Sequence, residues 1–177
     1  MKKLLIIALL IVGCDEVLEP NDCGGGIDKH IELLGECYNI ETTTWLMLDN
    51  KNLTGAIPPE IENLTNLMRI QLNDNQLTGS IPKEIGNLSY LQYLFLGNNQ
   101  LTGEIPEEIL NLNLVQLGLG NNQLTGIIPE SICNVNSINN LEIYEGSNIL
   151  SHNNFCPPYP DCLSETNVGI QDTTNCN

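Results

Sequence analysis

One short motif returns at a nearly constant interval through the middle of the chain. The triplet Leu-Thr-Gly occurs at Leu53-Thr54-Gly55, Leu77-Thr78-Gly79, Leu101-Thr102-Gly103 and Leu124-Thr125-Gly126. Successive copies are 24, 24 and 23 residues apart, and the last interval is shorter because Asn111–Leu114 has one residue fewer than the matching segments. A period of this length is typical of solenoid proteins, in which each unit buries its apolar face against its neighbours.

The apolar residues inside each unit predict a short strand. Three units fit the pattern Leu-x-x-Leu-x-Leu-x-x-Asn-x-Leu, namely Leu67/Ile70/Leu72/Asn75/Leu77, Leu91/Leu94/Leu96/Asn99/Leu101 and Leu114/Leu117/Leu119/Asn122/Leu124. Alternate residues of a strand point to the same face, so the two apolar side chains spaced by two are both expected to be buried.

The asparagine of each unit is predicted to have a structural role. It falls where the chain turns, and its side chain can both donate and accept hydrogen bonds, so it can satisfy backbone groups of the turn. The predicted asparagine ladder comprises Asn75, Asn99, Asn122 and Asn153. After each turn, an Ile-Pro pair and two apolar residues three apart predict a short helical or 3₁₀ turn on the opposite side of the unit.

The two end units depart from the pattern, as terminal repeats commonly do. In the first, Lys51 occupies the asparagine position. In the fifth, Leu150, Asn153 and Phe155 match, but about seven extra residues within 139–147 precede them, and we expect these to form a loop. The predicted organisation is an N-terminal cap at residues 28–45, about five repeats at residues 46–155 and a disulfide-rich C-terminal cap at residues 156–177.

The repeated motif Leu-x-x-Asn-x-Leu-Thr-Gly-x-Ile-Pro resembles the plant-type class of leucine-rich repeats. The resemblance implies an α/β solenoid, a right-handed coil with short parallel strands on its concave face and 3₁₀ or short helical turns on its convex face. It also implies disulfide caps at the two ends. The class occurs in plant receptor ectodomains, in polygalacturonase inhibitors and in bacterial surface proteins, so it names a fold without naming a ligand.

The first residues are typical of a signal peptide. Lys2 and Lys3 precede an apolar run of nine residues, Leu4–Val12, which is short of the roughly 20 residues that a membrane-spanning helix needs. The sequence Ile11-Val12-Gly13-Cys14 resembles the lipobox of bacterial lipoproteins, which implies cleavage after residue 13 and lipidation of Cys14. Residues 14–27 would then be the lipidated cysteine and a linker. The alternative is an ordinary cleaved signal peptide followed by an incidental cysteine.

Lipidation would leave an even number of cysteines outside the cytoplasm, which indicates disulfide bonds. The six are Cys23, Cys37, Cys133, Cys156, Cys162 and Cys176. We expect Cys23 to pair with Cys37 because both belong to the N-terminal cap. The other four allow three pairings. The repeat alignment places Cys162 within two residues of the position that stacks on Cys133, which favours Cys133 with Cys162 and, by elimination, Cys156 with Cys176.

The charge of the chain excludes some partners. Without residues 1–13, 4 basic residues stand against 22 acidic residues, a net charge of −18. Nucleic acid is therefore not an expected partner, since affinity for phosphates comes from lysine and arginine. His30 and His152 are the only histidines, and no phosphate-binding glycine pattern or nucleophile elbow occurs. The sequence predicts no enzyme, no cofactor and no metal.

The candidate ligand-binding surface is the concave face. Strand residues between the buried positions form two columns, Trp45/Arg69/Tyr93/Gln116 and Met47/Gln71/Phe95/Gly118. Aromatic residues and arginine are common anchors of protein interfaces. The predicted ligand contacts are Trp45, Met47, Arg69, Gln71, Tyr93 and Phe95. The alternative is that Trp45 and Met47 pack under the N-terminal cap.

The functional prediction combines this surface with the predicted anchor. We expect an extracytoplasmic module, secreted across the inner membrane and held by lipid in the cell envelope or at the cell surface, that binds a protein or peptide through the concave face. One alternative is a glycan-binding or adhesion protein, because exposed aromatic rings also stack on sugars. Another alternative, an inhibitor of a secreted hydrolase, comes from family analogy alone.

Overall fold

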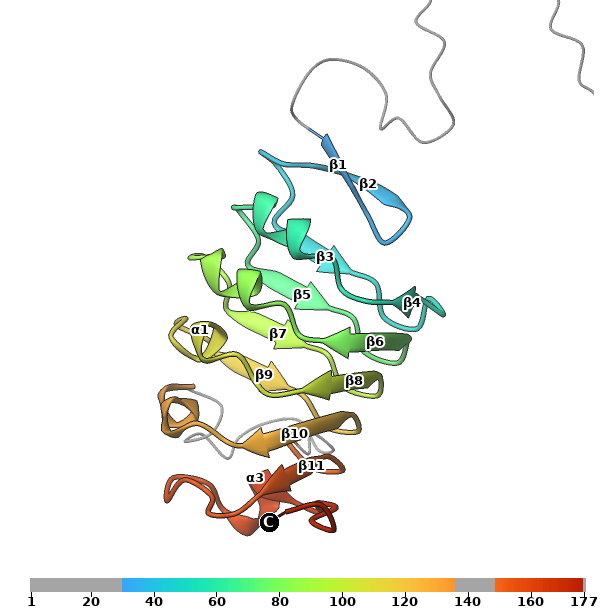
Figure 1. Ribbon diagram of the computed structural model, residues 1–177. Coiled ribbons are helices and arrows are strands. Elements are labelled where there is room, and N and C mark those ends of the chain that lie inside the picture. The colour runs from blue at the N-terminus through green and yellow to red at the C-terminus, as the bar shows by residue number, and fades with distance from the viewer. Residues whose placement is uncertain (1–29, 136–148, 177) are drawn as a thin grey trace, which may run out of the picture.

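The computed structural model describes residues 30–135 and 149–176, and these form a leucine-rich-repeat solenoid. Successive repeats stack in sequence order, from the blue end to the red end of the molecule (Figure 1). The predicted signal peptide, Cys14, the linker, Cys23 and the loop at residues 139–147 lie outside the described residues.

The predicted strands form one wall of the solenoid, here called the concave sheet. It consists of four parallel strands in the order β3 (Trp45–Met47), β5 (Arg69–Gln71), β7 (Tyr93–Phe95) and β9 (Gln116–Gly118). The central residue of each strand points into the core, and the two flanking residues point out. The prediction of short parallel strands is confirmed.

A second parallel sheet lies on another side of each repeat, where the sequence predicts only a turn. Its order is β11 (Asn154–Cys156), β10 (Gln123–Ile127), β8 (Gln100–Gly103), β6 (Gln76–Ser80) and β4 (Thr54–Gly55). The leucine of each of the last three Leu-Thr-Gly triplets is buried, and its neighbours Gln and Thr are exposed, as the period of a half-buried strand requires. The glycines adopt φ between +76° and +85°, a region that favours glycine over other residues.

The third side of each repeat carries the predicted short helical turns. They are η1 (Pro59–Asn63), η2 (Lys83–Asn87), α1 (Glu107–Leu110) and η3 (Glu130–Asn134). Each follows the proline of an Ile-Pro pair, whose extended backbone directs the chain into the turn. The one α-helical turn, α1, belongs to the 23-residue repeat. A Cβ atom on Gly86 would lie only 2.5 Å from the Cβ atom of Glu108, so glycine is what permits η2 and α1 to approach so closely.

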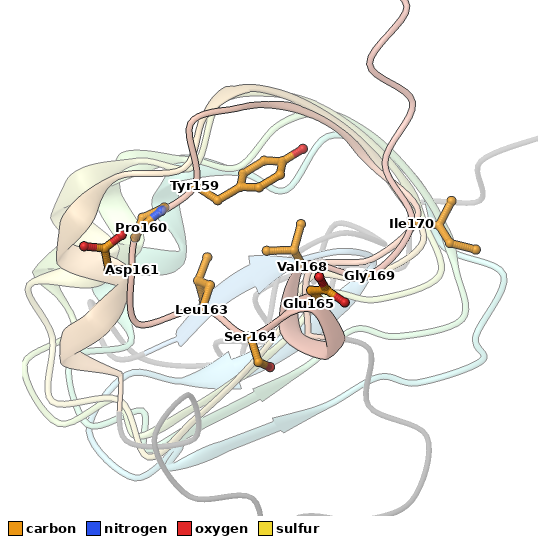
Figure 2. Close-up of a pocket in the computed structure, with 9 residues that line it drawn as sticks. All are labelled: Tyr159, Pro160, Asp161, Leu163, Ser164, Glu165, Val168, Gly169 and Ile170. Carbon is orange, nitrogen blue, oxygen red and sulfur yellow. The ribbon is translucent and has the colours of Figure 1, made fainter.

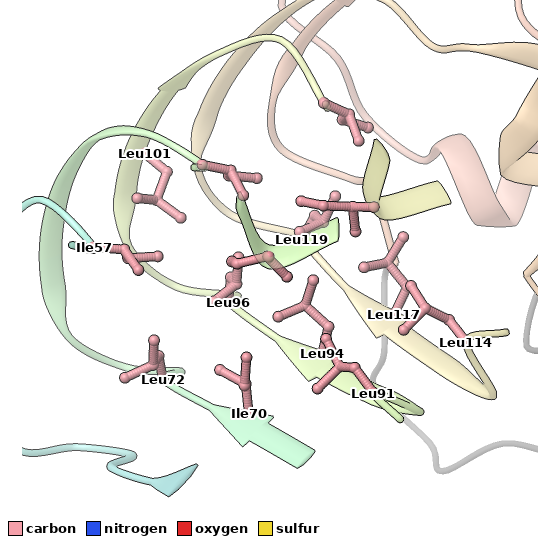
Figure 3. Packing of buried hydrophobic residues seen from close by; sticks show 14 of the residues in the cluster. Ile57, Ile70, Leu72, Leu91, Leu94, Leu96, Leu101, Leu114, Leu117 and Leu119 are labelled. Atoms are coloured by element: carbon pink, nitrogen blue, oxygen red, sulfur yellow. The ribbon is translucent and has the colours of Figure 1, made fainter. Parts of the chain in front are cut away.

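The core is a continuous column of leucine and isoleucine enclosed by these three walls. Equivalent residues of neighbouring repeats pack directly on one another, as Ile70, Leu94 and Leu117 do (Figure 3). All three expose 2% or less of their surface. Complete burial of such a side chain is worth about 1.5–3 kcal/mol, so every repeat adds several such contributions, but only while a neighbour covers it.

The asparagine ladder ties each repeat to the one before it. The Nδ2 atom of Asn99 donates to the carbonyl oxygen of Leu72 in the preceding repeat at 2.9 Å and to that of Leu96 in its own repeat at 3.0 Å. Its Oδ1 atom accepts from the backbone N–H of Leu77 at 3.0 Å. Asn75, Asn122 and Asn153 make the corresponding bonds in their own repeats.

The residue before the asparagine position of each repeat adopts a left-handed backbone conformation. These residues are Asn50, Asp74, Asn98, Asn121 and His152, with φ between 52° and 56°. Asparagine, aspartate and histidine are the non-glycine residues most often found in this region. In each of these repeats the left-handed residue therefore turns the chain, and the residue at the asparagine position stabilises the turn by hydrogen bonds.

Disulfides close the C-terminal end of the solenoid. Cys133 is bonded to Cys162, and Cys156 to Cys176, the same pairing that the repeat alignment predicts. At the other end β1 (His30–Leu33) and β2 (Glu36–Asn39) form an antiparallel hairpin. Cys37, in β2, is also disulfide-bonded.

Gln171 completes the asparagine ladder at the C-terminal end, inside the segment that the sequence analysis assigns to the cap. Its Oε1 atom accepts from the backbone N–H of Phe155 at 3.2 Å. Its Nε2 atom donates to the carbonyl oxygens of Leu150 and Val168, at 2.9 and 2.6 Å. These are the three kinds of bond that Asn153 makes to the repeat before it and to its own. The short helix α3 (Glu165–Val168) leads into this last partial turn of the solenoid.

Candidate functional site

The two predicted columns lie side by side on the concave sheet. The strand register pairs Trp45 with Arg69, Arg69 with Tyr93, and Tyr93 with Gln116. The same register aligns Met47, Gln71, Phe95 and Gly118 in the second column. Trp45 and Met47 expose 62% and 53% of their surfaces, so the alternative that they are packed under the cap is not what the structure shows.

Arg69 is held between two aromatic rings of the next strand. Its Cζ atom lies 4.5 Å from the centre of the Tyr93 ring and 5.7 Å from that of Phe95. Both distances are within the range of cation–π attraction. The guanidinium group therefore joins the two columns into one surface, here called the concave patch, comprising Trp45, Met47, Arg69, Gln71, Tyr93 and Phe95.

A chain of hydrogen bonds fixes the polar part of the concave patch. Arg69 donates from Nη1 to the Oε1 atom of Gln71 at 3.1 Å, and Gln71 donates from Nε2 to the Oδ2 atom of Asp49 at 3.1 Å. The Oδ1 atom of Asp49 accepts from the backbone and side-chain N–H groups of Asn73, both at 3.2 Å. Asn73 in turn accepts from the backbone N–H of Gly97 at 2.9 Å. The head groups of Arg69 and Gln71 are thus positioned before any ligand arrives.

Asp49 and Gly118 are not among the six residues of the patch but support it, and neither role is predicted from the sequence. Asp49 aligns with Asn73 and Gly97 in successive repeats, so the only sequence signal is a polar residue just after the strand. Gly118 leaves space for Phe95, because a Cβ atom there would lie 3.1 Å from the Cδ1 atom of the ring. The sequence signal for Gly118 is that it has no side chain, whereas the other residues of its column do.

Met68 extends the apolar surface beyond the two columns. It directly precedes β5, exposes 39% of its surface, and its backbone N–H bonds to the carbonyl oxygen of Thr44, the residue before Trp45. Met68 could not be predicted from the strand pattern because it lies just outside the predicted strand.

A separate hollow lies at the C-terminal end of the solenoid, away from the concave patch. It has a volume of about 680 Å³, and Tyr159, Leu163 and Val168 converge on it (Figure 2). Ser164 on its rim is not positioned as a nucleophile. Its hydroxyl group accepts a hydrogen bond from the backbone N–H of Asn167 in α3. It is also hydrogen-bonded to the side chains of Thr166 and Asn167.

Two further classes of site find no support in the described part of the chain. Within residues 30–135 and 149–176, no three metal-ligating side chains lie together. Over the same ranges, no helix has both the length and the apolar composition to cross a bilayer.

Comparison with known sequences identifies the repeats. The family model described as leucine rich repeat matches residues 41–101, and a second model of the same description matches residues 113–135. Those segments of the chain are leucine-rich repeats. No curated protein sequence matches this chain significantly.

Solved plant structures share the solenoid. A BIR3–SERK2 complex from Arabidopsis thaliana is 32% identical, with a TM-score of 0.56 over 68% of this chain and 61% of that chain. The Arabidopsis receptor kinase HAESA, in complex with the peptide hormone IDA and the co-receptor SERK1, is 30% identical, with a TM-score of 0.56 over 71% of this chain and 20% of that chain. A plant ice-binding protein is 36% identical, with a TM-score of 0.54 over 63% of this chain and 34% of that chain. The chain therefore corresponds to less than two thirds of each of these chains.

Proposed function

We propose that this protein is a non-enzymatic module that binds a protein or peptide through the concave patch. The observation that carries the proposal is the arrangement of Arg69 over Tyr93 and Phe95 beside the exposed side chains of Trp45 and Met47. Tryptophan, tyrosine and arginine are the residues that contribute most binding energy in protein interfaces. Four of the six side chains in the patch are apolar or aromatic, in a protein whose surface is otherwise rich in acidic groups.

The rigidity of the patch supports a binding role. The hydrogen-bonded chain from Arg69 through Gln71 to Asp49 orders these side chains in advance, so a ligand would lose less conformational entropy on binding. Similar structures support the same role, since the BIR3–SERK2 and HAESA–IDA–SERK1 structures are complexes.

The proposal includes an extracytoplasmic location with a lipid anchor at Cys14, as in bacterial lipoproteins. Two disulfides within the described residues favour an oxidising compartment. The anchor is tested by mass spectrometry of the N-terminal peptide from the native organism. Acyl chains on Cys14 are expected, whereas an unmodified Cys14 or a mature N-terminus further along the chain would disprove the anchor and leave the binding module intact.

The binding function is tested with a double variant of the patch. Crosslinking in the native organism identifies candidate ligands, and calorimetry with purified components then gives their affinities. The variant Tyr93→Ser/Phe95→Ser removes both rings from outward strand positions, and we expect a loss of affinity of about 30-fold or more, typical of interface anchors.

A matched control distinguishes the patch from exposed aromatic surface in general. Tyr90, which exposes 62% of its surface, follows η2 and lies outside the strands of the concave sheet. The variant Tyr90→Ser should bind as the original chain does. Equal affinities of the original chain and the double variant would refute the assignment of the concave patch.

A glycan ligand is the second candidate. The exposed indole ring of Trp45 and the ring of Tyr93 offer faces for stacking on sugars, and Gln71 and Asp49 offer hydrogen-bonding groups nearby. Glycan arrays probed with a chain that begins at Asp15 separate the two candidates. Saturable binding to one class of glycan, lost on Trp45→Ala, would favour the glycan over the protein ligand.

A further inference from the structure

The outward face of the second sheet carries little charge compared with the rest of the protein. Eight exposed polar residues from its strands form what is here called the threonine face: Thr54, Gln76, Thr78, Ser80, Gln100, Thr102, Gln123 and Thr125. Ile127, at the end of β10, is exposed on the same side. None of these residues is charged, although the chain has 22 acidic and 6 basic residues. Glu104, directly after β8, is exposed and brings one carboxylate group onto this face, beside Gly126 of β10. The face also contains no aromatic residue.

The threonine face is a regular array. The strand register places Thr54 beside Gln76, Thr78 beside Gln100, and Ser80 beside Thr102. Thr102 is paired in the same way with Gln123 on the next strand. Neighbouring strands of a sheet are about 4.8 Å apart, so the hydroxyl and amide groups recur at a fixed interval across four repeats.

The array is rigid and its polar groups are available. Beneath it Leu77, Leu101 and Leu124 are fully buried, so each strand is held by both the core and its hydrogen-bonded neighbours. Within the described residues, none of the eight side chains forms a hydrogen bond with another group of the protein, so their donors and acceptors face solvent.

The composition of the face argues against several partners. A surface that binds another protein would be expected to include tryptophan, tyrosine or arginine as anchors. Sugar-binding surfaces commonly offer an aromatic ring for stacking, and a nucleic acid would require positive charge. A repetitive surface with almost no charge is suited to a partner that is itself uncharged and repetitive.

We propose that the threonine face adsorbs to ice. An ice surface is an uncharged lattice of water molecules that donate and accept hydrogen bonds. Threonine presents a methyl group, around which water becomes ordered, and a hydroxyl group that can replace a water molecule of the lattice. Each contact is weak. Many contacts add up here because the sheet holds the side chains at a constant spacing before they meet the crystal.

Ice binding is tested on the purified chain in its natural processed form. The measurements are the fraction of protein taken up by slowly growing ice and the gap between the melting and freezing points of a seed crystal. The original chain should be enriched in the ice fraction and should open a measurable gap. Exclusion from ice, with no such gap, would overturn the proposal.

Substitutions locate the adsorbing face. The variant Thr78→Tyr/Thr102→Tyr places bulky rings at two exposed strand positions, where the buried leucines are untouched, and should reduce the freezing gap at least tenfold. The control Ser89→Tyr adds the same ring after η2, at an exposed position outside the second sheet, and should keep the activity. Circular dichroism melting of each variant checks that the fold is retained. Equal loss in the two variants would contradict the assignment of the face.

The remaining outcomes are also decisive. Threonine→valine and threonine→serine changes at Thr102 separate the methyl group from the hydroxyl group, and both should lower ice activity less than tyrosine does. Binding to crystalline cellulose or chitin, without uptake into ice and lost in Thr78→Tyr/Thr102→Tyr, would assign the face to a polysaccharide and overturn the ice proposal. Because Tyr93→Ser/Phe95→Ser should leave ice uptake unchanged, failure of this proposal is distinguishable from failure of the concave patch.

Discussion

At the scale of single residues, asparagine stabilises this fold because its short side chain ends in both a donor and an acceptor. Asn99 uses both ends within one turn of the chain, and it is 9% exposed. No other side chain of that length offers the same combination. The neighbouring Asn98 exploits a different property, tolerance of the left-handed backbone.

Replacing Asn99 by alanine should therefore destabilise the protein strongly. The backbone N–H of Leu77 and the carbonyl oxygens of Leu72 and Leu96 would lose a partner. Each buried group left unsatisfied costs about 1–3 kcal/mol, so we expect a loss of at least about 2 kcal/mol in the free energy of unfolding. Urea denaturation measures the change. The exposed Asn111→Ala, just after α1, serves as a control and should have little effect.

Because of Tyr38, we expect the protein to lose stability in alkaline solution. Burial raises the pKa of its hydroxyl group above the ordinary value of 10.0, and the charge of Glu36, which accepts its hydrogen bond at 3.1 Å, raises the pKa further. The neutral form is favoured in the folded state. Its contribution to stability is thus complete below pH 10 and decreases above it, as tyrosine ionises in the unfolded chain.

The measurement is denaturation by urea at neutral pH and at about pH 11. The original chain should lose more stability between the two pH values than Tyr38→Phe does. An equal loss in the two proteins would show that the Tyr38 hydroxyl group has no part in the alkaline transition.

At the scale of elements, period-two and period-three patterns in the sequence predict strands and helical turns. Structure that forms only when repeats stack is not predicted. The concave strands and the helical turns follow from apolar spacing. The second sheet does not, because a glycine with positive φ inside a short segment is more typical of a turn than of a strand. It becomes a sheet only because identical segments of neighbouring repeats pair. The roles of Asp49 and Gly118 escape prediction for the same reason, since each acts on a residue one repeat away.

The packing of η2 on α1 yields a prediction for Gly86. In Gly86→Ala the new methyl group would meet the Cβ atom of Glu108 at 2.5 Å and its backbone at 2.8 Å, so the two turns must separate. Overpacking of this kind costs about 1–3 kcal/mol. In the comparison variant Gly55→Ala, nothing lies within 4 Å, and the cost is the positive φ of +84° alone, about 1–2 kcal/mol. A stabilised Gly86→Ala protein would contradict the close packing.

The final rung of the ladder yields a prediction for Gln171. Gln171→Ala removes the acceptor for the Phe155 N–H group and the donor to Leu150 and Val168. We expect faster hydrogen exchange at the Phe155 amide, by at least about tenfold if about 1.4 kcal/mol of local stability is lost. Amides of the central repeats, such as Leu101, should exchange as before. Unchanged protection of Phe155 would indicate that Gln171 does not close the ladder.

At the scale of the whole molecule, the repeat period fixes the architecture, whereas the ligand is not encoded in that period. Buried positions recur because every repeat imposes the same requirement on them. Exposed positions such as Trp45, Arg69 and Tyr93 are free to differ from repeat to repeat, so their identity points to binding but does not name the partner. The two disulfides of the described C-terminal end could be predicted because stacking brings Cys133 near Cys162.

The disulfides should matter most for the end of the molecule. In Cys156→Ala/Cys176→Ala the bond that closes the final turn is absent, and a disulfide of this kind contributes about 2–4 kcal/mol. We expect a lower melting temperature by calorimetry and earlier proteolysis within residues 156–176. The central repeats should be cleaved later. Simultaneous cleavage throughout the chain would instead show that the solenoid unfolds as one unit.

The ladder has a consequence for how such a protein changes over generations. Each rung bonds only to its own coil and to the coil before it, and Gln171 supplies the terminating bonds whatever number of coils precedes it. A gene that gains or loses one complete repeat therefore encodes a chain in which every hydrogen-bonding group of the ladder again has a partner. The number of repeats, and with it the length of both sheets, can change by recombination alone. Point mutations can then alter the outward faces of the two sheets independently.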